Sequence, residues 1–226
     1  AKLMVRAVRA SGRPSEELIS RVRKAGGLEA GGWQLDAELM KDLLKSVQQD
    51  GSASKGEAIY RRKGLLCMKC HAIGGAGGKV GPDLISIGGS APVDYLVESL
   101  LVPNKKVKEN FHALQVLTDE GKVVNGIPVR KTKSELVLRT AEDNVVTIPI
   151  ESIDQSKEGR SLMPDGTVDA LTREELVHLV RFLSELGKVG EFSVGKAQVV
   201  RRWQSLTFSP QANRRAAIGR VAQARC

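Results

Sequence analysis

Aromatic residues are scarce in this chain of 226 residues, in which phenylalanine, tryptophan and tyrosine together make up 4%. Hydrophobic residues of all kinds nevertheless make up 41%, so the core must be aliphatic apart from any apolar cofactor that it holds. Long hydrophobic runs are also lacking, and no stretch approaches the ~20 apolar residues that a membrane-spanning helix requires. The length allows one large domain or two small ones.

Cysteine is rare too, and two of the three cysteines fall in one pentapeptide, Cys-Met-Lys-Cys-His at positions 67–71. Two thiols at this spacing can add to the two vinyl groups of one haem, and the histidine that follows can then reach the iron. The motif therefore predicts one covalently attached haem c, held by Cys67 and Cys70, with His71 as an axial ligand.

Three other interpretations of the pentapeptide stay open. A zinc ribbon needs further ligands, and only Cys226, His112 and His178 remain for that role, scattered along the chain. A thioredoxin-type redox pair needs a preceding strand and a βαβ frame, whereas a glycine-rich stretch follows here. A chance match is the third, as for any motif this short. Cys226, the final residue, is expected to be a free thiol at a truncation boundary.

A secretory leader is lacking as well, because the opening residues carry charge but no apolar stretch follows them. Covalent haem attachment takes place outside the cytoplasm. The chain is therefore expected to be the mature or excised portion of a longer exported protein, located in the periplasm or elsewhere outside the cytoplasm.

Acidic residues are fewer than basic ones: 26 Asp and Glu stand against 35 Lys and Arg, which gives a formal net charge of +9. Arginines crowd the last segment, 188–226, which we expect to be a basic C-terminal extension. A basic surface can steer an acidic redox partner toward the protein. Nucleic acid would also account for the charge, but no recognition motif accompanies it, so we do not expect nucleic acid as a partner.

Residues 1–51 carry helical patterns. Ser15 can cap one helix, which ends at Gly26, and Asp36 can cap a second one with apolar residues at helical spacing. Short helices separated by glycines indicate the tail of a larger helical region. The Gly-Ser-Ala-Ser stretch at 51–54 is expected to be a linker.

Three further helices are expected beyond this stretch. One runs from about 54 to 62, directly before the pentapeptide, and one runs from 92 to about 102. A capping box formed by Thr172 and Glu175 begins the third. Residues 73–90 are rich in glycine, which favours an irregular loop that wraps closely around something flat.

The hydrophobic pattern changes to a period of two between residues 111 and 154. Short β-prone runs alternate there with turn residues, and they predict a small antiparallel sheet or partly closed barrel of four or five strands. Pro128 and Pro149 are expected at edges or bulges of this sheet. The four runs are 114–118, 123–129, 135–139 and 145–150.

A haem iron bound by His71 needs a sixth ligand or keeps an open site. Methionine sulfur is a soft ligand that favours ferrous iron and raises the reduction potential. Met163 is the candidate, because it lies in a loop just before the last helix. Met68 lies inside the attachment motif and cannot reach the far face, whereas Met4 and Met40 fall on apolar helix faces, where core packing explains them better.

Two histidines compete with Met163 as the sixth ligand. His178 lies on the capped last helix, where a surface or packing role explains it better. His112 begins the first predicted strand and is the weaker competitor on geometry.

The proximal histidine needs a hydrogen-bond acceptor for its second ring nitrogen, because this bond fixes the orientation of the ring. A backbone carbonyl in the Gly-Pro-Asp-Leu segment at 81–84 is expected to provide it, and Pro82 makes that segment a rigid turn. Leu84 and Ile87 are expected to lie along the edge of the haem.

The residues around the pentapeptide resemble those of a class I cytochrome c. Gly56 and Tyr60 precede the motif, Gly-Pro-Asp-Leu follows it, and a Met-Pro pair precedes a last helix that contains Phe182. In that family the first and last helices cross, with a small residue at the contact and aromatic residues beside it. The resemblance gives these roles to Gly56, Tyr60 and Phe182.

Longer stretches resemble the haem-binding domain of large planctomycete-type exported proteins, and this resemblance covers about residues 52–187. In those proteins the domain commonly follows helical repeats, and sometimes β-propeller dehydrogenase-like regions. The stretches that carry the resemblance are 70–84, 98–103 and 161–166.

The resemblance and the patterns together imply an α+β architecture. A mostly α, cytochrome c-like domain is expected over 52–110 and 155–187, with a small antiparallel β module inserted at 111–154. A helical extension (1–51) would precede it and the basic extension (188–226) would follow.

The expected function is outer-sphere electron transfer by one haem with His71 and Met163 as axial ligands. The alternative is a haem enzyme or gas-binding sensor with an open or labile sixth site. No catalytic nucleophile or acid–base pair stands out, so the segment itself is not expected to be an enzyme, although its parent protein could be a dehydrogenase. A redox protein or a neighbouring domain is the expected partner. For the β module, a cover over the haem edge, a docking face and a homodimer contact stay open.

Overall fold

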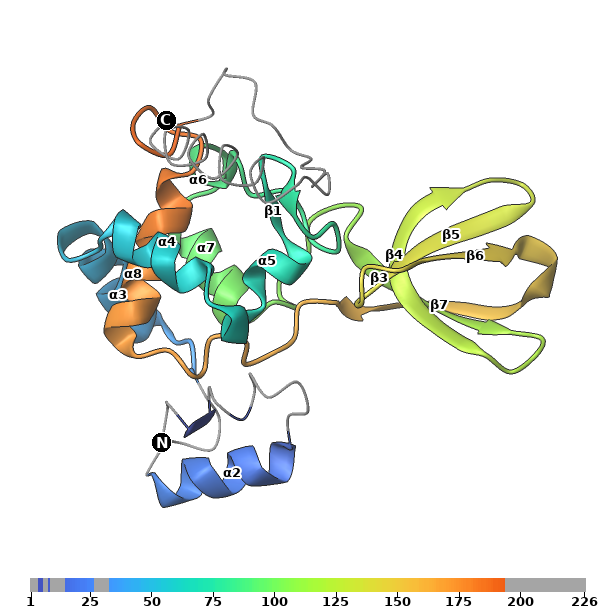
Figure 1. Cartoon of the computed structure of the whole chain (residues 1–226), viewed down its shortest axis with the longest axis horizontal. Helices are drawn as coiled ribbons and strands as arrows, with labels where there is room; N and C mark the ends of the chain where they lie inside the picture. Colours follow the sequence, from blue (N-terminus) through green and yellow to red (C-terminus); the bar gives the residue numbers. More distant parts are fainter. Residues whose placement is uncertain (1–3, 6–7, 9–14, 27–32, 194–226) are drawn as a thin grey trace, which may run out of the picture. The chain divides into compact units, whose positions relative to one another are not determined.

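The computed structural model describes residues 4–5, 8, 15–26 and 33–193. Within them the chain forms seven α-helices, a five-stranded antiparallel sheet and a small two-stranded sheet (Figure 1), so the expected α+β class is confirmed. No helix among these residues is long and apolar enough to cross a bilayer. Cys226 and the arginines of the last segment lie outside the described residues.

The helices and strands are distributed in three stretches along the chain. Helical structure comes first, the larger sheet interrupts it, and one long helix closes the described part. The α-helices are α2 (Glu16–Ala25), α3 (Ala37–Gln49), α4 (Ala53–Tyr60), α5 (Cys67–Cys70), α6 (Ile87–Ser90), α7 (Val93–Leu101) and α8 (Arg173–Glu185). The strands are β1 (Ala72–Ile73), β2 (Ala76–Gly77), β3 (His112–Thr118), β4 (Val123–Lys131), β5 (Glu135–Thr140), β6 (Val145–Pro149) and β7 (Ile153–Ser161). Two short 3₁₀ turns, Lys63–Leu65 and Ile150–Ser152, complete the list.

The helices begin where the sequence predicts. The side chains of Ser15 and Asp36 accept hydrogen bonds from the backbone N–H three residues on, at the start of α2 and α3. Thr172 and Glu175 form the complete capping box of α8. Such caps satisfy backbone donors that have no partner inside the helix.

The main core is built around α8, which packs against α3, α4, α6 and α7. Its residues Leu176, Leu179 and Val180 are almost completely buried. Leu43 and Val47 of α3 belong to the same core. The last helix is thus the common packing surface for helices that lie far apart in the sequence.

The linker expected at 51–54 is wrong. Ser52 caps α4, and its backbone N–H donates to Nδ1 of the buried His178 at 3.1 Å. A Cβ on Gly51 would lie 2.8 Å from the Cβ of Arg181, so this glycine serves a close approach to α8 rather than flexibility. Residues of α3 and α4 belong to one hydrophobic core, so this core continues across residue 51.

Helix α2 forms a small cluster of its own, in which Ile19 packs with Val5 and Ala170. An ion pair of 2.5 Å between Arg23 and Asp169 supports this contact, and both side chains are mostly buried. The packing role expected for Met4 is wrong, because its side chain is 59% exposed.

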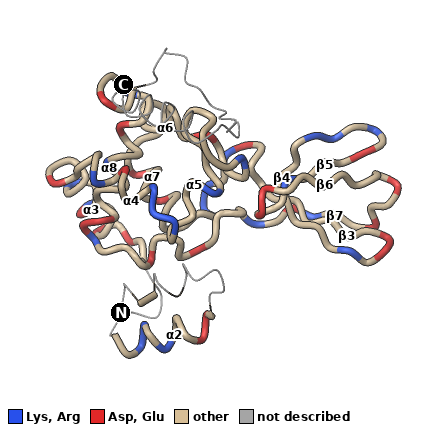
Figure 2. Tube along the Cα trace, viewed as in Figure 1, with Lys and Arg blue, Asp and Glu red and all other residues tan. Residues whose placement is uncertain are grey.

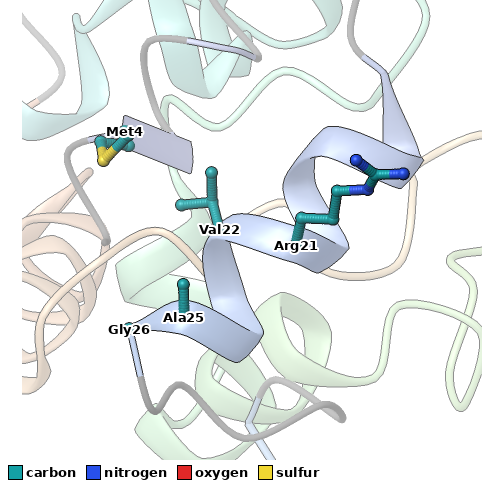
Figure 3. Close-up of a pocket in the computed structure, with 5 residues that line it drawn as sticks. All are labelled: Met4, Arg21, Val22, Ala25 and Gly26. Carbon is teal, nitrogen blue, oxygen red and sulfur yellow. The ribbon is translucent and has the colours of Figure 1, made fainter.

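Met4 lines a hollow beside α2 (Figure 3). The other residues that line it are Arg21, Val22, Ala25 and Gly26. None of the predicted haem or iron ligands lines this hollow.

The five-stranded sheet has the order β6-β5-β4-β3-β7, with every pair antiparallel. One face carries a separate small core made of Val116, Val124, Leu136, Leu138 and Ile148. The prolines lie as predicted: Pro128 adjoins a shift of register between β4 and β5, and Pro149 ends the edge strand β6. The sheet therefore has a small core of its own, separate from the main core of the helices.

The fifth strand, β7, was not located by the sequence, and the module boundary expected at residue 154 falls too early. The strand continues to Ser161, where it pairs with His112 of β3. Most of its residues are exposed, so it lacks the alternation of apolar and polar residues by which strands are detected.

Candidate functional site

The two cysteines of the pentapeptide lie on one helical turn, α5. Residues three apart on a helix lie on the same face, so the Cys67 and Cys70 side chains project to the same side. Both are free thiols and both are partly exposed. The turn closes with the backbone N–H of His71, which donates to the Cys67 carbonyl at 2.8 Å.

Burial raises the pKa of Cys67 to about 11, and it also raises the pKa of Cys70. Both groups are therefore neutral thiols near pH 7. Among residues 4–5, 8, 15–26 and 33–193, no group of three or more His, Cys, Asp or Glu side chains is arranged to hold a metal ion. The zinc-ribbon interpretation thus gains no support from the described part of the chain.

The ring of His71 is held by the backbone of Pro82. Its Nδ1 atom lies 2.9 Å from the Pro82 carbonyl oxygen, which is the contact expected from the sequence. A carbonyl oxygen can only accept a hydrogen bond, so Nδ1 carries the proton and Nε2 keeps its lone pair. Burial lowers the pKa of His71, although the bond to Pro82 acts in the opposite direction. A neutral imidazole with a free Nε2 is the form that binds iron.

The backbone of the glycine-rich loop (73–90) contacts the backbone of the pentapeptide directly. The backbone N–H of Gly81 donates to the Cys70 carbonyl at 2.7 Å, and that of Gly78 donates to the Met68 carbonyl at 2.9 Å. A Cβ on Gly81 would lie only 2.4 Å from Cε1 of His71. The glycines are therefore required because the loop backbone touches the motif and the imidazole ring.

Asp83 ties the loop together. Its carboxylate accepts hydrogen bonds from the backbone N–H groups of Gly74, Gly75 and Ile85 at 2.7–3.0 Å. Since Asp83 follows Pro82 directly, these bonds also hold the carbonyl that orients His71.

Helices α4 and α8 support the attachment motif through Tyr60. The hydroxyl of Tyr60 in α4 donates to the His71 carbonyl at 3.2 Å. The Tyr60 ring packs on Phe182 of α8, with ring centroids 5.6 Å apart. At Gly56 the two helices touch, because a Cβ there would lie 2.0 Å from the His178 carbonyl oxygen. The arrangement agrees with the roles that the resemblance gives to Gly56, Tyr60 and Phe182.

The remaining predicted site residues lie at the edge of the main core. Cys67, Leu84, Ile87 and Met163 are each partly buried and each pack against it. Other partly buried apolar residues of this edge are Ile73, Tyr95 and Leu101. Segments far apart in the sequence thus present apolar side chains that the core does not fully cover.

The two histidines that compete with Met163 as the sixth ligand both have other partners. His178 is 5% exposed, and its ring nitrogens contact the Ser52 backbone N–H at 3.1 Å and the Glu174 carboxylate at 3.2 Å. His112 lies at the start of β3 and contacts Glu158 at 2.8 Å. The packing role expected for His178 is confirmed.

Two residues near the site were missed by the sequence. Asp143, in the turn between β5 and β6, accepts a hydrogen bond from the Lys79 backbone N–H at 3.3 Å. Asn104, just after α7, bonds to Ser161 and Asp165. The only signal for either residue is local, a turn-forming Asn or Asp between two elements, and it says nothing about a distant partner.

Three exposed lysines accompany the motif. Figure 2 shows positive charge on the short helix α5, which contains Lys69. Lys63 precedes the cysteines and Lys79 lies in the glycine-rich loop, and all three lysines are exposed. Carboxylates lie close by as well, since Asp143 accepts the Lys79 amide and acts electrostatically on Cys70, so charges of both signs surround the thiols.

Comparisons with known proteins add no identification, since no protein-family model and no curated protein matches the chain. The function is accordingly inferred from the residues and the geometry described above.

Proposed function

We propose that this chain contains a monohaem c-type cytochrome domain that transfers electrons by an outer-sphere mechanism. Cys67 and Cys70 would hold the haem through thioether bonds, and His71 and Met163 would bind its iron. The observation that carries the proposal is the hydrogen bond from His71 Nδ1 to the Pro82 carbonyl. It keeps the proton on Nδ1 and leaves the lone pair of Nε2 available, immediately after two free thiols on one helical turn.

The residues of this region fit such a group. A haem is a large, flat and mostly apolar body, and the edge of the main core offers partly buried Leu84, Ile87 and Met163. The absence of a Cβ on Gly81 lets the loop lie flat against the His71 ring. When bound, the haem supplies an iron that changes between the ferric and ferrous states.

Each residue then has a defined task. The two cysteines prevent loss of the cofactor, and His71 binds the iron with a ring orientation set by Pro82. With haem bound, the apolar edge would exclude water from the site, and low polarity favours the ferrous state because it carries less charge. Met163 adds a soft ligand that favours the same state. Because the protein carries the electron without changing a substrate, no acid–base pair is needed.

The setting of the domain follows from the same proposal. Covalent haem attachment would place the domain outside the cytoplasm. Its electron donor would be a redox protein or a neighbouring domain, and a dehydrogenase region of the parent protein is one such donor. The exposed lysines beside the motif favour an acidic docking surface on that partner.

The test is expression of the chain together with a haem-attachment system. We expect a c-type absorption spectrum that survives acid–acetone extraction, and its loss when Cys67 and Cys70 are both replaced by serine. A protein that takes up no haem would contradict the proposal and favour an interaction module with a structural cysteine pair.

The sixth ligand needs a second measurement. We expect the wild type to show the ferric sulfur-to-iron charge-transfer band, and Met163→Ala to abolish it. Met4→Ala is the matched control, since Met4 is 59% exposed, and it should leave the band unchanged. Ready binding of carbon monoxide to the reduced wild type would instead indicate an open site, as in a haem enzyme or a gas sensor.

A further inference from the structure

The chain enters the β module after α7 and leaves it after β7. Asn104 connects these two points, which we call the base of the module, by hydrogen bonds. It lies between α7 and β3, where the chain enters the module. Its Oδ1 accepts a hydrogen bond from the backbone N–H of Ser161, the last residue of β7, at 2.9 Å. Its Nδ2 donates to the carboxylate of Asp165 at 3.2 and 3.3 Å.

These two partners lie on either side of Met163, each two residues away. Ser161 is also bonded to Met163 directly, since its Oγ accepts the Met163 backbone N–H at 3.1 Å. One amide side chain therefore holds both flanks of the loop that presents the Met163 thioether.

Asparagine is suited to this task because its side chain has an acceptor and a donor on one rigid group. An alanine at position 104 would leave both flanks without their partner. A carboxylate at position 104 would still accept from Ser161, but it could not donate to Asp165 and would face a like charge there.

We propose that Asn104 is a positioning residue for Met163, through which the base of the β module holds the sixth-ligand loop in place. This inference rests on the proposed function, and it assigns the β module the role of ordering the loop that carries the sixth ligand. A thioether is a weak ligand, so a loop that is already ordered loses less conformational entropy when its sulfur binds.

The test compares variants of the haem-loaded protein by three measurements: the ferric sulfur-to-iron band, the reduction potential and carbon monoxide binding by the ferrous form. In Asn104→Ala and Asn104→Asp we expect a weaker band, a lower potential and an affinity for carbon monoxide that is about tenfold higher, as for the loss of other groups that orient a ligand. Asn125→Ala is the matched control, because Asn125 is an exposed asparagine of the same module. It should resemble the wild type.

A swapped pair separates positioning from folding. In the double variant Asn104→Asp with Asp165→Asn, the amide at position 165 can donate to the carboxylate at position 104, which still accepts from Ser161. We expect the band and the potential to return toward the wild-type values. This variant also decides the matter if Asn104→Ala does not fold.

Two results would overturn the inference. One is a normal band and potential in Asn104→Asp, and the other is a double variant no better than that single one. A wild type that holds covalent haem but shows no sulfur band would refute Met163 ligation and this inference together. A wild type with the band and unaffected Asn104 variants would refute this inference alone.

Discussion

The carbonyl oxygen of His178 lies directly over Gly56, 2.0 Å from the place where a Cβ atom would stand. Helix α4 can therefore lie against α8 only because residue 56 has no side chain. This contact sets the position of Tyr60, one turn further along α4, whose hydroxyl bonds to the backbone of the attachment motif.

Replacing Gly56 by alanine should destabilise the protein in spite of the better helix propensity of alanine. The propensity gain is about 1 kcal/mol, whereas overpacking against a fixed backbone costs more, so we expect a net loss of about 2 kcal/mol. Unfolding in guanidinium chloride measures this loss of free energy. Gly159→Ala is the control, since a Cβ there meets its nearest atoms at 3.5 Å. Equal stability of the two variants would contradict the close crossing.

The Tyr60 hydroxyl should contribute about 1 kcal/mol through its bond to the His71 carbonyl. Tyr60→Phe removes that bond but keeps the ring contact with Phe182. We expect a loss of this size in chemical unfolding, and only a small loss in Tyr95→Phe, since Tyr95 is partly buried without a hydrogen bond to another described residue. A Tyr60→Phe protein as stable as the wild type would show that the bond does not form.

Gly81→Ala should disturb the orientation of His71. The new methyl group would lie 2.4 Å from Cε1 of the ring, so either the ring or the loop must move and the bond to Pro82 lengthens. We expect a loss of about 2 kcal/mol in unfolding free energy and a lower yield of covalent haem. In the control, Gly89→Ala, the nearest atom lies 3.7 Å away. A normal haem yield from Gly81→Ala would argue against the tight contact.

Asp143→Asn should loosen the contact between the β5–β6 turn and the glycine-rich loop. Asp143 has a φ of 68°, a conformation that asparagine also tolerates, so the turn is kept while the charge is lost. The carboxylate pairs with Arg139 at 2.5 Å and accepts the Lys79 amide. We expect faster hydrogen exchange at the Lys79 amide, by about fivefold for a loss of about 1 kcal/mol. Asp154→Asn, an exposed control in β7, should leave that amide unchanged.

Local signals in the sequence predicted much of the helical part. Ser15, Asp36 and Thr172 are caps whose partners lie three residues away, so their effect depends on nearby residues alone. The hydrogen bond from His71 to the 81–84 segment was also predictable, because ring orientation requires a close acceptor.

The features that the sequence did not predict depend on contacts between residues that lie far apart in the chain. Gly51 reads as part of a flexible linker, but its small size serves contact with Arg181 in α8. Asn104 bonds to a residue 57 positions away, and no periodicity or motif marks such a pair. Strand β7 exposes most of its residues, so its pairing with β3 leaves no hydrophobic pattern.

The closed base of the β module has a consequence for how this architecture can change. Asn104 and Ser161 join the two ends of the β module where it meets the helical part, and Asp143 adds a second contact through the Lys79 amide. Each doubling of a closed excursion costs only about 0.6 kcal/mol in chain entropy. The loops of the module away from these two contacts can therefore be lengthened at little cost in chain entropy.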